Sequence, residues 1–270
     1  MKNIYGDGTQ YHIQVKPGDV GEYVILCGDP GRVEKIAAYL DNPVFVSQNR
    51  EYTIYNGYID TTLVTVASTG IGGPSAAICV EELIKCGAKF FIRVGTSGGI
   101  RTDVVGGDLV IATAAVRDDG TSREYLHESY PAAADFNIVR ALADEAATLC
   151  DSTVGNGYHV GVVQSKDSFY GETDPESMPI SDALLKRWES YVRLGCLTSE
   201  MECAAIFAVA QTRGVYAGAV MLAIWNVEDL KVNPNPLINT DTAKAIKCAV
   251  GAIQRIRRDT RFLQKAPQKP

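Results

Sequence analysis

The stretch "TTLVTVASTGIGGPSAAICVEELIKCG", residues 61–87, decides the fold class because it holds a strand, a turn and a helix in direct succession. Its first half is an apolar run with β-strand character that ends in a glycine turn. Pro74 then stands at a helix start, apolar residues follow at helical spacing, and Gly87 marks the end of the helix. The stretch therefore predicts a buried strand that leads through a tight turn into a helix.

Other segments of the chain follow the same order. The segments "YVILCGDPGR" at 23–32 and "FFIRVGTSGGI" at 90–100 are also apolar runs that end in glycine turns. Further strands are predicted over 106–116, 158–171 and 216–226, and further helices over 30–40, 135–150 and 240–259. This alternation predicts an α/β fold with a mixed, largely buried sheet in a single domain over residues 1–270. We expect a frayed tail from about residue 262.

Composition excludes several classes of function. The chain has 270 residues and a net charge of −6, which disfavours binding to nucleic acid or to anionic membranes. No apolar stretch of about 18 residues is free of charge, and the start "MKNIYGDGTQYHIQ" lacks the apolar core of a secretory signal. Seven cysteines are scattered singly, and the three histidines are not spaced with them, so a zinc site is disfavoured. We expect a cytoplasmic protein with reduced thiols.

Arg93 is a charged residue inside a strand that otherwise has a core composition, "FFIRVGTS". An unpaired buried guanidinium costs several kcal/mol, so Arg93 needs a fixed anionic partner. An internal ion pair would satisfy it. However, Gly95 and Thr96 follow directly, and Arg32 lies just beyond the "GDPG" turn of an earlier strand. Two arginines, a hydroxyl and glycine-turn amides at strand ends suit a phosphate.

Glu200 and Glu202 lie in "LTSEMECAAIFAVAQ", residues 197–211, just before a run that has the composition of a buried helix. On an extended segment their side chains share one face. Paired carboxylates can serve as general acid and base, as in glycoside hydrolases, as metal ligands, or as acceptors for vicinal hydroxyls. Beside a phosphate pocket, the hydroxyls of a ribose are the best account.

Four segments, "GDPGRVEKI", "STGIGGPSAAICVEEL", "IRVGTSGGI" and "SEMECAA", resemble the signature segments of the nucleoside phosphorylase-I family. The resemblance is closest to the uridine phosphorylase branch and runs in the same order from about residue 12 to 255. It implies a single α/β domain around a mixed, barrel-like sheet flanked by helices. It also implies dimers that usually build hexamers, and cleavage of a nucleoside by inorganic phosphate to ribose 1-phosphate and free base. Such a reaction requires no redox or organic cofactor.

The resemblance also implies roles for particular residues. The residues that would hold phosphate are Gly28, Arg32, Arg93, Thr96 and, from a neighbouring subunit, Arg50. The residues that would hold ribose are Glu200, Met201, Glu202 and, across the dimer interface, His12. Arg32, Arg93 and Glu202 would carry the catalysis. A monovalent cation such as potassium would lie at Glu51, Ile71 and Ser75.

The predicted base pocket departs from the uridine pattern in the loop "DSFYGETDPESM", residues 167–178. Phe169 can stack on a base, but Glu172 stands at the glutamine position and Ser177 where close relatives have an arginine. An ionised Glu172 offers acceptors only. Glu172 is therefore protonated, or it points away, or the base presents more donors than uracil does.

Trp225 and Asn226, in "IWNVED", complete the predicted base pocket, and Asn226 stands where hexameric purine enzymes carry a proton-donating aspartate. We expect a phosphorylase of uridine-type nucleosides. The alternatives are a purine phosphorylase with a rebuilt base loop, a hydrolase that uses water, and a catalytically idle relative that binds nucleosides.

Overall fold

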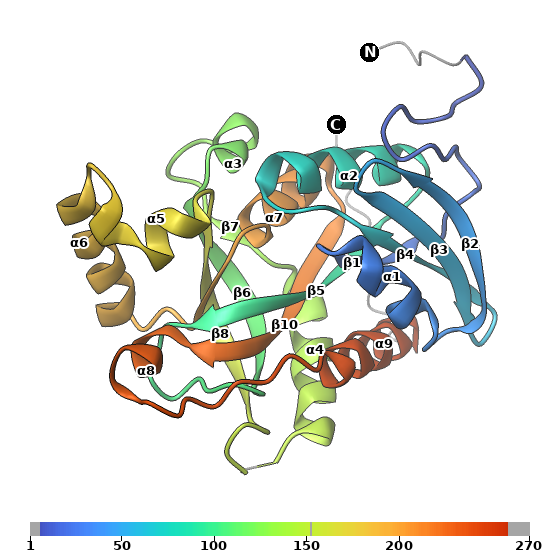
Figure 1. Ribbon diagram of the computed structural model, residues 1–270. Coiled ribbons are helices and arrows are strands. Elements are labelled where there is room, and N and C mark those ends of the chain that lie inside the picture. Colours follow the sequence, from blue (N-terminus) through green and yellow to red (C-terminus); the bar gives the residue numbers. More distant parts are fainter. Residues whose placement is uncertain (1–5, 152, 259–270) are drawn as a thin grey trace.

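The computed structural model describes residues 6–151 and 153–258 (Figure 1); the tail expected to fray from about residue 262 lies outside them. The strands are β1 (Tyr23–Cys27), β2 (Asp41–Asn49), β3 (Tyr52–Ile59), β4 (Thr62–Ser68), β5 (Phe90–Gly99), β6 (Leu109–Asp118), β7 (Ala132–Ala133), β8 (Tyr158–Lys166), β9 (Thr198–Glu200) and β10 (Tyr216–Asn226). The α-helices are α1 (Pro30–Ala37), α2 (Gly73–Lys85), α3 (Thr121–Tyr125), α4 (Phe136–Leu149), α5 (Phe169–Thr173), α6 (Ser181–Arg193), α7 (Cys203–Arg213), α8 (Val227–Val232) and α9 (Ala243–Arg258), and a short 3₁₀ turn spans Pro175–Ser177.

The strands of this described chain form one mixed sheet that closes on itself at one end. Its order is β10-β6-β8-β9-β5-β1-β4-β3-β2, β7 pairs with β6, and β10 also pairs with β5. Strands β5, β10, β6, β8 and β9 therefore form a closed barrel, and the other long strands extend from β5 as a wing (Figure 1). The expected α/β fold with a barrel-like sheet is confirmed.

Helices cover both faces of this sheet, and most residues of its central strands are buried. Along β1, Val24 and Leu26 pack with residues of α2 and α7, whereas Ile25 and Cys27 pack with residues of α1, α4 and α9. This alternation follows from the two-residue period of a strand. In Figure 1, α2 and α7 lie above the sheet and α4 and α9 below it. Within the described ranges, no helix combines the length and apolar character needed to cross a membrane.

The carboxyl ends of three parallel strands meet at one edge of the sheet. Cys27 at the end of β1 lies opposite Ser68 at the end of β4, and Leu26 lies opposite Arg93 in β5. The two glycine turns that follow β1 and β4 therefore lie beside the second half of β5. This places the segments that were predicted to bind ligand next to one another.

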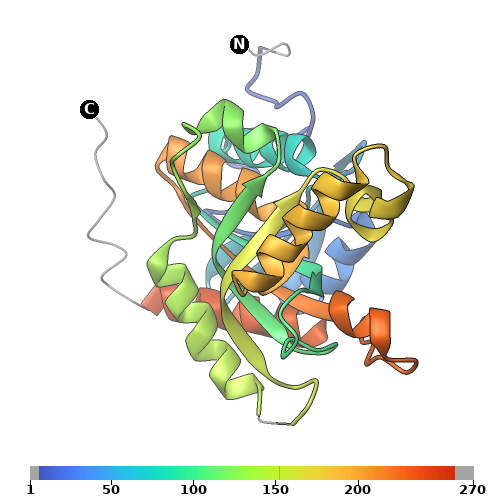
Figure 2. The same cartoon turned by 90° about the vertical axis from the view of Figure 1, so that its left-hand side faces the viewer.

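Most of the long predicted elements match the structure, but the strand predicted over 158–171 ends at Lys166, and Phe169–Thr173 forms the helix α5 because the hydroxyl of Ser168 caps it. The short elements α3, β7 and α8 were not predicted, nor were two longer regions. The segment 41–59 forms the β2–β3 hairpin, whose outer strand is largely exposed and polar. The segment 181–193 forms α6, which buries little beyond Tyr191 and lies with α5 at the outer side of the barrel (Figure 2). Neither segment shows an apolar run that ends in glycine, the signal that gave the strands at 23–32, 61–75 and 90–100.

The packing of α4 on β10 requires a residue without a side chain at Gly218. A Cβ added to Gly218 would lie 2.5 Å from Cγ2 of Ile138, so Gly218→Ala should lower the free energy of unfolding by about 1–3 kcal/mol through overpacking. Gly120→Ala is a suitable control because the added Cβ would lie 3.5 Å from Asp167, an ordinary contact. Urea denaturation of both variants measures the difference, and equal stabilities would contradict the packing described.

Candidate active site

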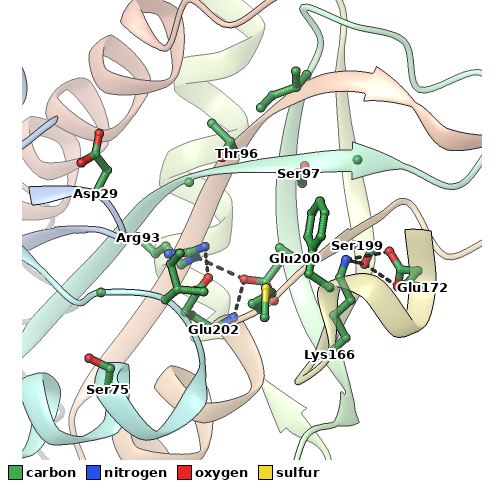
Figure 3. Close-up of a pocket in the computed structure, with 18 of the residues that line it drawn as sticks. Asp29, Ser75, Arg93, Thr96, Ser97, Lys166, Glu172, Ser199, Glu200 and Glu202 are labelled. Atoms are coloured by element: carbon green, nitrogen blue, oxygen red, sulfur yellow. Dashed lines mark hydrogen bonds and ion pairs between the residues drawn. The ribbon is translucent and has the colours of Figure 1, made fainter. Parts of the chain in front are cut away.

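A cavity of about 750 Å³ opens at the edge where β1, β4 and β5 end (Figure 3). Its walls come from segments far apart in the sequence. The residues that line it include Gly28, Arg32, Gly70, Arg93, Thr96, Lys166, Phe169, Glu172, Ser199, Glu200, Met201, Glu202 and Trp225. Most of the residues predicted for phosphate, ribose and base therefore lie around one space.

Arg93 is almost fully buried and lies between the two glutamates of the β9–α7 junction. Its NH2 group donates a hydrogen bond to Oε2 of Glu202, and its Nε lies 3.3 Å from Oε2 of Glu200. Arg93 thus finds its anionic partner inside the protein, in an ion pair with Glu202 and beside Glu200. Burial acts to lower the pKa of Arg93, but the carboxylates of Glu202 and Glu200 outweigh it and hold the pKa above its usual range. Within the described chain, NH1 of Arg93 has no hydrogen-bond partner.

The two glutamates are held differently. Glu200 accepts hydrogen bonds from the hydroxyl of Ser165 and from the backbone amides of Glu202 at 2.8 Å and Cys203 at 3.0 Å. These contacts fasten the start of α7 to β8. Glu202 accepts the amide of Gly72 at 2.7 Å in addition to the Arg93 contact. Glu202 therefore keeps more unused acceptor capacity at the cavity than Glu200 does.

Burial raises the pKa of Glu202, and the facing Arg93 only partly opposes this effect. A carboxylate in this position gains from any further donor that enters the cavity, because hydrogen bonds to the charged form favour it. The hydroxyls of a sugar are donors of this kind.

The residues predicted to hold phosphate lie together. Arg32, Thr96 and Gly28 line the same cavity as Arg93. Among the residues that the structure describes, no carboxylate forms an ion pair with Arg32. A Cβ on Gly95 would lie 3.1 Å from Cζ of Arg93, so a glycine here leaves the guanidinium its room. Two guanidinium groups and a hydroxyl around one space form a site for an oxyanion.

His12 and Arg50 do not line the cavity of their own chain. Nδ1 of His12 lies 2.7 Å from Oε1 of Glu82, and Arg50 occupies the turn after β2 with a φ of 54°. Both residues were predicted to reach the site of a neighbouring subunit, and that remains a prediction.

Asn226 is not brought to the base end of the cavity. Its amide nitrogen donates to the carbonyls of Arg101 and Val104, both at 2.8 Å, and its oxygen accepts the amide of Asp229 at 3.0 Å. These three bonds hold the loop after β5 against the end of β10. The neighbouring Trp225 does line the cavity, as predicted.

The residues predicted for a monovalent cation line one side of the cavity. The hydroxyl of Ser75 lies 2.7 Å from Oε1 of Glu51 and 2.5 Å from the carbonyl oxygen of Thr69, while Ile71 is largely exposed. The hydrogen bond from Ser75 lowers the pKa of Glu51. Clustered carboxylate, hydroxyl and carbonyl oxygens are suitable ligands for a hard cation. Elsewhere in residues 6–151 and 153–258, no group of three or more His, Cys, Asp or Glu side chains is arranged for a metal ion.

The base end contains a charged residue that the sequence analysis missed. Nζ of Lys166 lies 2.6 Å from Oε1 of Glu172 and 2.5 Å from the hydroxyl of Ser199, and it lies 5.7 Å from the ring centroid of Phe169. Figure 3 shows this group on the opposite side of Glu200 from Arg93. Glu172 is therefore paired with a lysine, an outcome that none of the three sequence-based alternatives included. The signal was available, because a lysine at the end of a buried strand needs a partner for the same reason as Arg93.

The fold and the site together describe an α/β protein in which two arginines, two paired glutamates and a lysine–glutamate pair line one cavity. The model of the phosphorylase superfamily matches residues 22–252, and this chain belongs to that family. The chain is 46% identical to a uridine phosphorylase of Treponema pallidum, over 94% of this chain and 96% of the relative. It is 42% identical to a uridine phosphorylase of Thermococcus kodakarensis, over 82% and 78%. It is 43% identical to a guanosine phosphorylase of Halorubrum lacusprofundi, over 78% and 81%.

The two arginines of the oxyanion site should differ in their effect on stability. Arg93→Met leaves two buried carboxylates without their cation and should lower the free energy of unfolding by about 3–5 kcal/mol. Arg32→Met, a matched removal of a guanidinium from the same cavity, should change it by no more than about 0.5 kcal/mol, because no carboxylate loses its partner. Urea unfolding in phosphate-free buffer measures both, and similar losses would contradict the role given to Arg93.

Proposed function

We propose that this protein is a nucleoside phosphorylase that cleaves the N-glycosidic bond of uridine-type nucleosides with inorganic phosphate. The products are ribose 1-phosphate and the free base. The observation that carries this proposal is the buried Arg93, which pairs with Glu202 through one nitrogen and lines the same cavity as Arg32 and Thr96. A cation in that position contacts the phosphate directly and the carboxylate of Glu202, which in turn binds the sugar. The names of the relatives, most of them uridine phosphorylases, support the same activity.

The arrangement accounts for each part of the reaction. Arg32, Arg93 and Thr96 hold and orient the phosphate, and Glu202 accepts hydrogen bonds from the ribose hydroxyls, with Met201 against the sugar. A phosphate oxygen then forms a bond to C1′ while the bond from C1′ to the base nitrogen breaks. The electron pair of that bond leaves with the base. Charge therefore grows on the base, which stacks on Phe169 beside the Lys166 ammonium.

The pair formed by Lys166 and Glu172 explains how a base loop without the usual glutamine and arginine serves uracil. Lys166 supplies an N–H donor and Glu172 a neighbouring acceptor, which is the pattern that a glutamine amide would offer. Uracil presents the complementary edge, a carbonyl next to the N3–H. The ammonium also stabilises the negative charge of the departing base, a role suited to the missing arginine.

A purine phosphorylase remains a second candidate on two observations. One relative at 43% identity is named guanosine phosphorylase. A second cavity of about 710 Å³ adjoins the base end, and Lys166, Phe169, Glu172 and Trp225 line both spaces. Guanine also presents a carbonyl beside an N–H, so it matches the same donor and acceptor. Uridine is favoured because the amide of Asn226, at the position of the purine enzymes' aspartate, is engaged with backbone groups.

The cell compartment, the assembly and the ion belong to the same proposal. The chain works in the cytoplasm as one catalytic domain over residues 1–270, in dimers that share active sites and assemble into hexamers. His12 and Arg50 complete the ribose and phosphate sites of the neighbouring subunit. Potassium binds at Glu51 and Ser75 beside Ile71, and the reaction needs no redox or organic cofactor. Its partners are a nucleoside and phosphate, with neither nucleic acid nor a membrane involved.

A nucleoside panel tests the activity and the base together. Base release from uridine, deoxyuridine, thymidine, inosine, guanosine and adenosine is measured with and without phosphate, and uridine should be cleaved only with phosphate. Lys166→Gln should lower kcat/KM for uridine about 100-fold because it removes the cation beside the leaving base. Lys89→Gln, which changes a half-exposed lysine that pairs with Glu22 and lines neither cavity, is the matched control and should leave kcat/KM unchanged. Release without phosphate would indicate a hydrolase, and purine-only cleavage would favour the second candidate.

Shared active sites predict complementation between two inactive variants. Arg50→Ala removes the phosphate contact made in the neighbouring subunit, and Glu202→Gln removes the ribose acceptor of its own subunit. When equal amounts are unfolded together and refolded, half of the dimers are mixed and each holds one intact site, so about a quarter of wild-type activity should return. Variants refolded separately and then mixed serve as the control. Activity that stays at the level of the single variants would contradict a shared site.

A further inference from the structure

The hydroxyl of Ser199 lies at the centre of a buried polar cluster behind the base end. It lies 2.5 Å from Nζ of Lys166, 2.5 Å from Oε1 of Gln164 and 2.9 Å from Oε2 of Glu172. Both Ser199 and Gln164 are at most 3% exposed, so water does not compete for these contacts. The geometry therefore offers the hydroxyl one donor and two acceptors.

A serine hydroxyl has a single proton and can serve only one of the two acceptors. Lys166 has no lone pair and must donate, so Ser199 accepts from Lys166 and passes its own proton either to Gln164 or to Glu172. The choice matters at the base end. If the proton goes to Glu172, the carboxylate loses acceptor capacity that a base could use. If it goes to Gln164, that capacity stays free.

Asp118 fixes the choice through the amide of Gln164. Nε2 of Gln164 donates to Oδ2 of Asp118 at 3.1 Å, while NH1 of Arg187 donates to the other oxygen at 2.9 Å. Burial and the carboxylate of Asp118 raise the pKa of Tyr191, whose hydroxyl stays protonated and bonds to the same carboxylate. A flipped Gln164 would place its oxygen against this carboxylate. The amide oxygen therefore points at Ser199 and takes its proton, as the shorter contact indicates.

We propose that Gln164 and Asp118 are positioning residues that direct the Ser199 hydroxyl away from Glu172 and so keep Glu172 open to an N–H of the base. The inference rests on the proposed function, which places a base at this end of the cavity. Lys166 uses two of its three N–H groups on Glu172 and Ser199, so one donor and one acceptor face the base. The edge they read is a carbonyl beside an N–H, as in uracil.

A double-mutant cycle tests whether Gln164 acts through Ser199. Gln164→Met removes the acceptor at similar volume and should lower kcat/KM for uridine about 10-fold, mostly through a higher KM, because the hydroxyl turns to Glu172. In a Ser199→Ala background there is no hydroxyl to turn, so adding Gln164→Met should cost less than about 2-fold. Asp118→Asn should follow the same pattern, which provides a second route if one variant folds poorly.

Two measurements distinguish a positioning role of Gln164 from a general loss of structure in the variants. The thermal stabilisation by inorganic phosphate should be the same in all variants, because the oxyanion site is not changed. The preference for uridine over 3-methyluridine, which lacks the N3–H, should shrink in Gln164→Met, because Glu172 no longer reads that proton. The inference is wrong if the effects of Gln164→Met and Ser199→Ala on kcat/KM multiply in the double variant, or if Gln164→Met leaves the preference for uridine over 3-methyluridine unchanged. Either result would leave the proposed function standing. A wild-type protein that does not cleave uridine with phosphate would overturn the proposed function and the inference with it.

Discussion

The interaction on which the site depends is the buried contact of Arg93 with Glu202 and Glu200. Three charges without water are stable only when each has fixed partners, and here the partners come from separate parts of the chain. The amide of Gly72 at the start of α2 and the hydroxyl of Ser165 in β8 complete the set. One ion pair thereby joins the strand β5, the junction before α7, a glycine turn and the barrel wall.

The topology of the sheet makes this contact possible. Parallel pairing of β1 with β4 and with β5 brings two glycine turns beside the second half of β5. The short β9 pairs antiparallel with β5 through Gly98 and Gly99, so the chain that leaves β9 runs back toward Arg93. Strand β1 thus runs parallel to β5, whereas β9 runs antiparallel to it. Together the pairings bring the β9–α7 junction, with Glu200 and Glu202, and the two glycine turns to the part of β5 that carries Arg93.

The parts that could be predicted from the sequence are those with a local signal. Apolar runs, three of them ending in glycine, gave most of the long strands, and burial of a charge gave Arg93 and Glu202. The β2–β3 hairpin and α6 lack such a run because one face of each is open to solvent. The link from Lys166 to Ser199 joins residues 33 positions apart and depends on β8 and β9 becoming neighbours, which no local pattern specifies. Asn226 was misplaced because backbone carbonyls of a distant loop take its amide.

The base end shows why a charged pair needs more support than the amide whose pattern it reproduces. A glutamine carries its donor and acceptor in one rigid neutral group, whereas Lys166 and Glu172 must be desolvated together and held in register. Ser199 and Gln164 supply the additional hydrogen bonds that compensate for this desolvation. In the proposed reaction the cation would lie where the departing base becomes negative, and in a site shielded from water that attraction is far stronger than at a surface. The proposed reading of a neutral base by a lysine and a glutamate, and the stabilisation of its anion, would therefore depend on the buried network behind the pair.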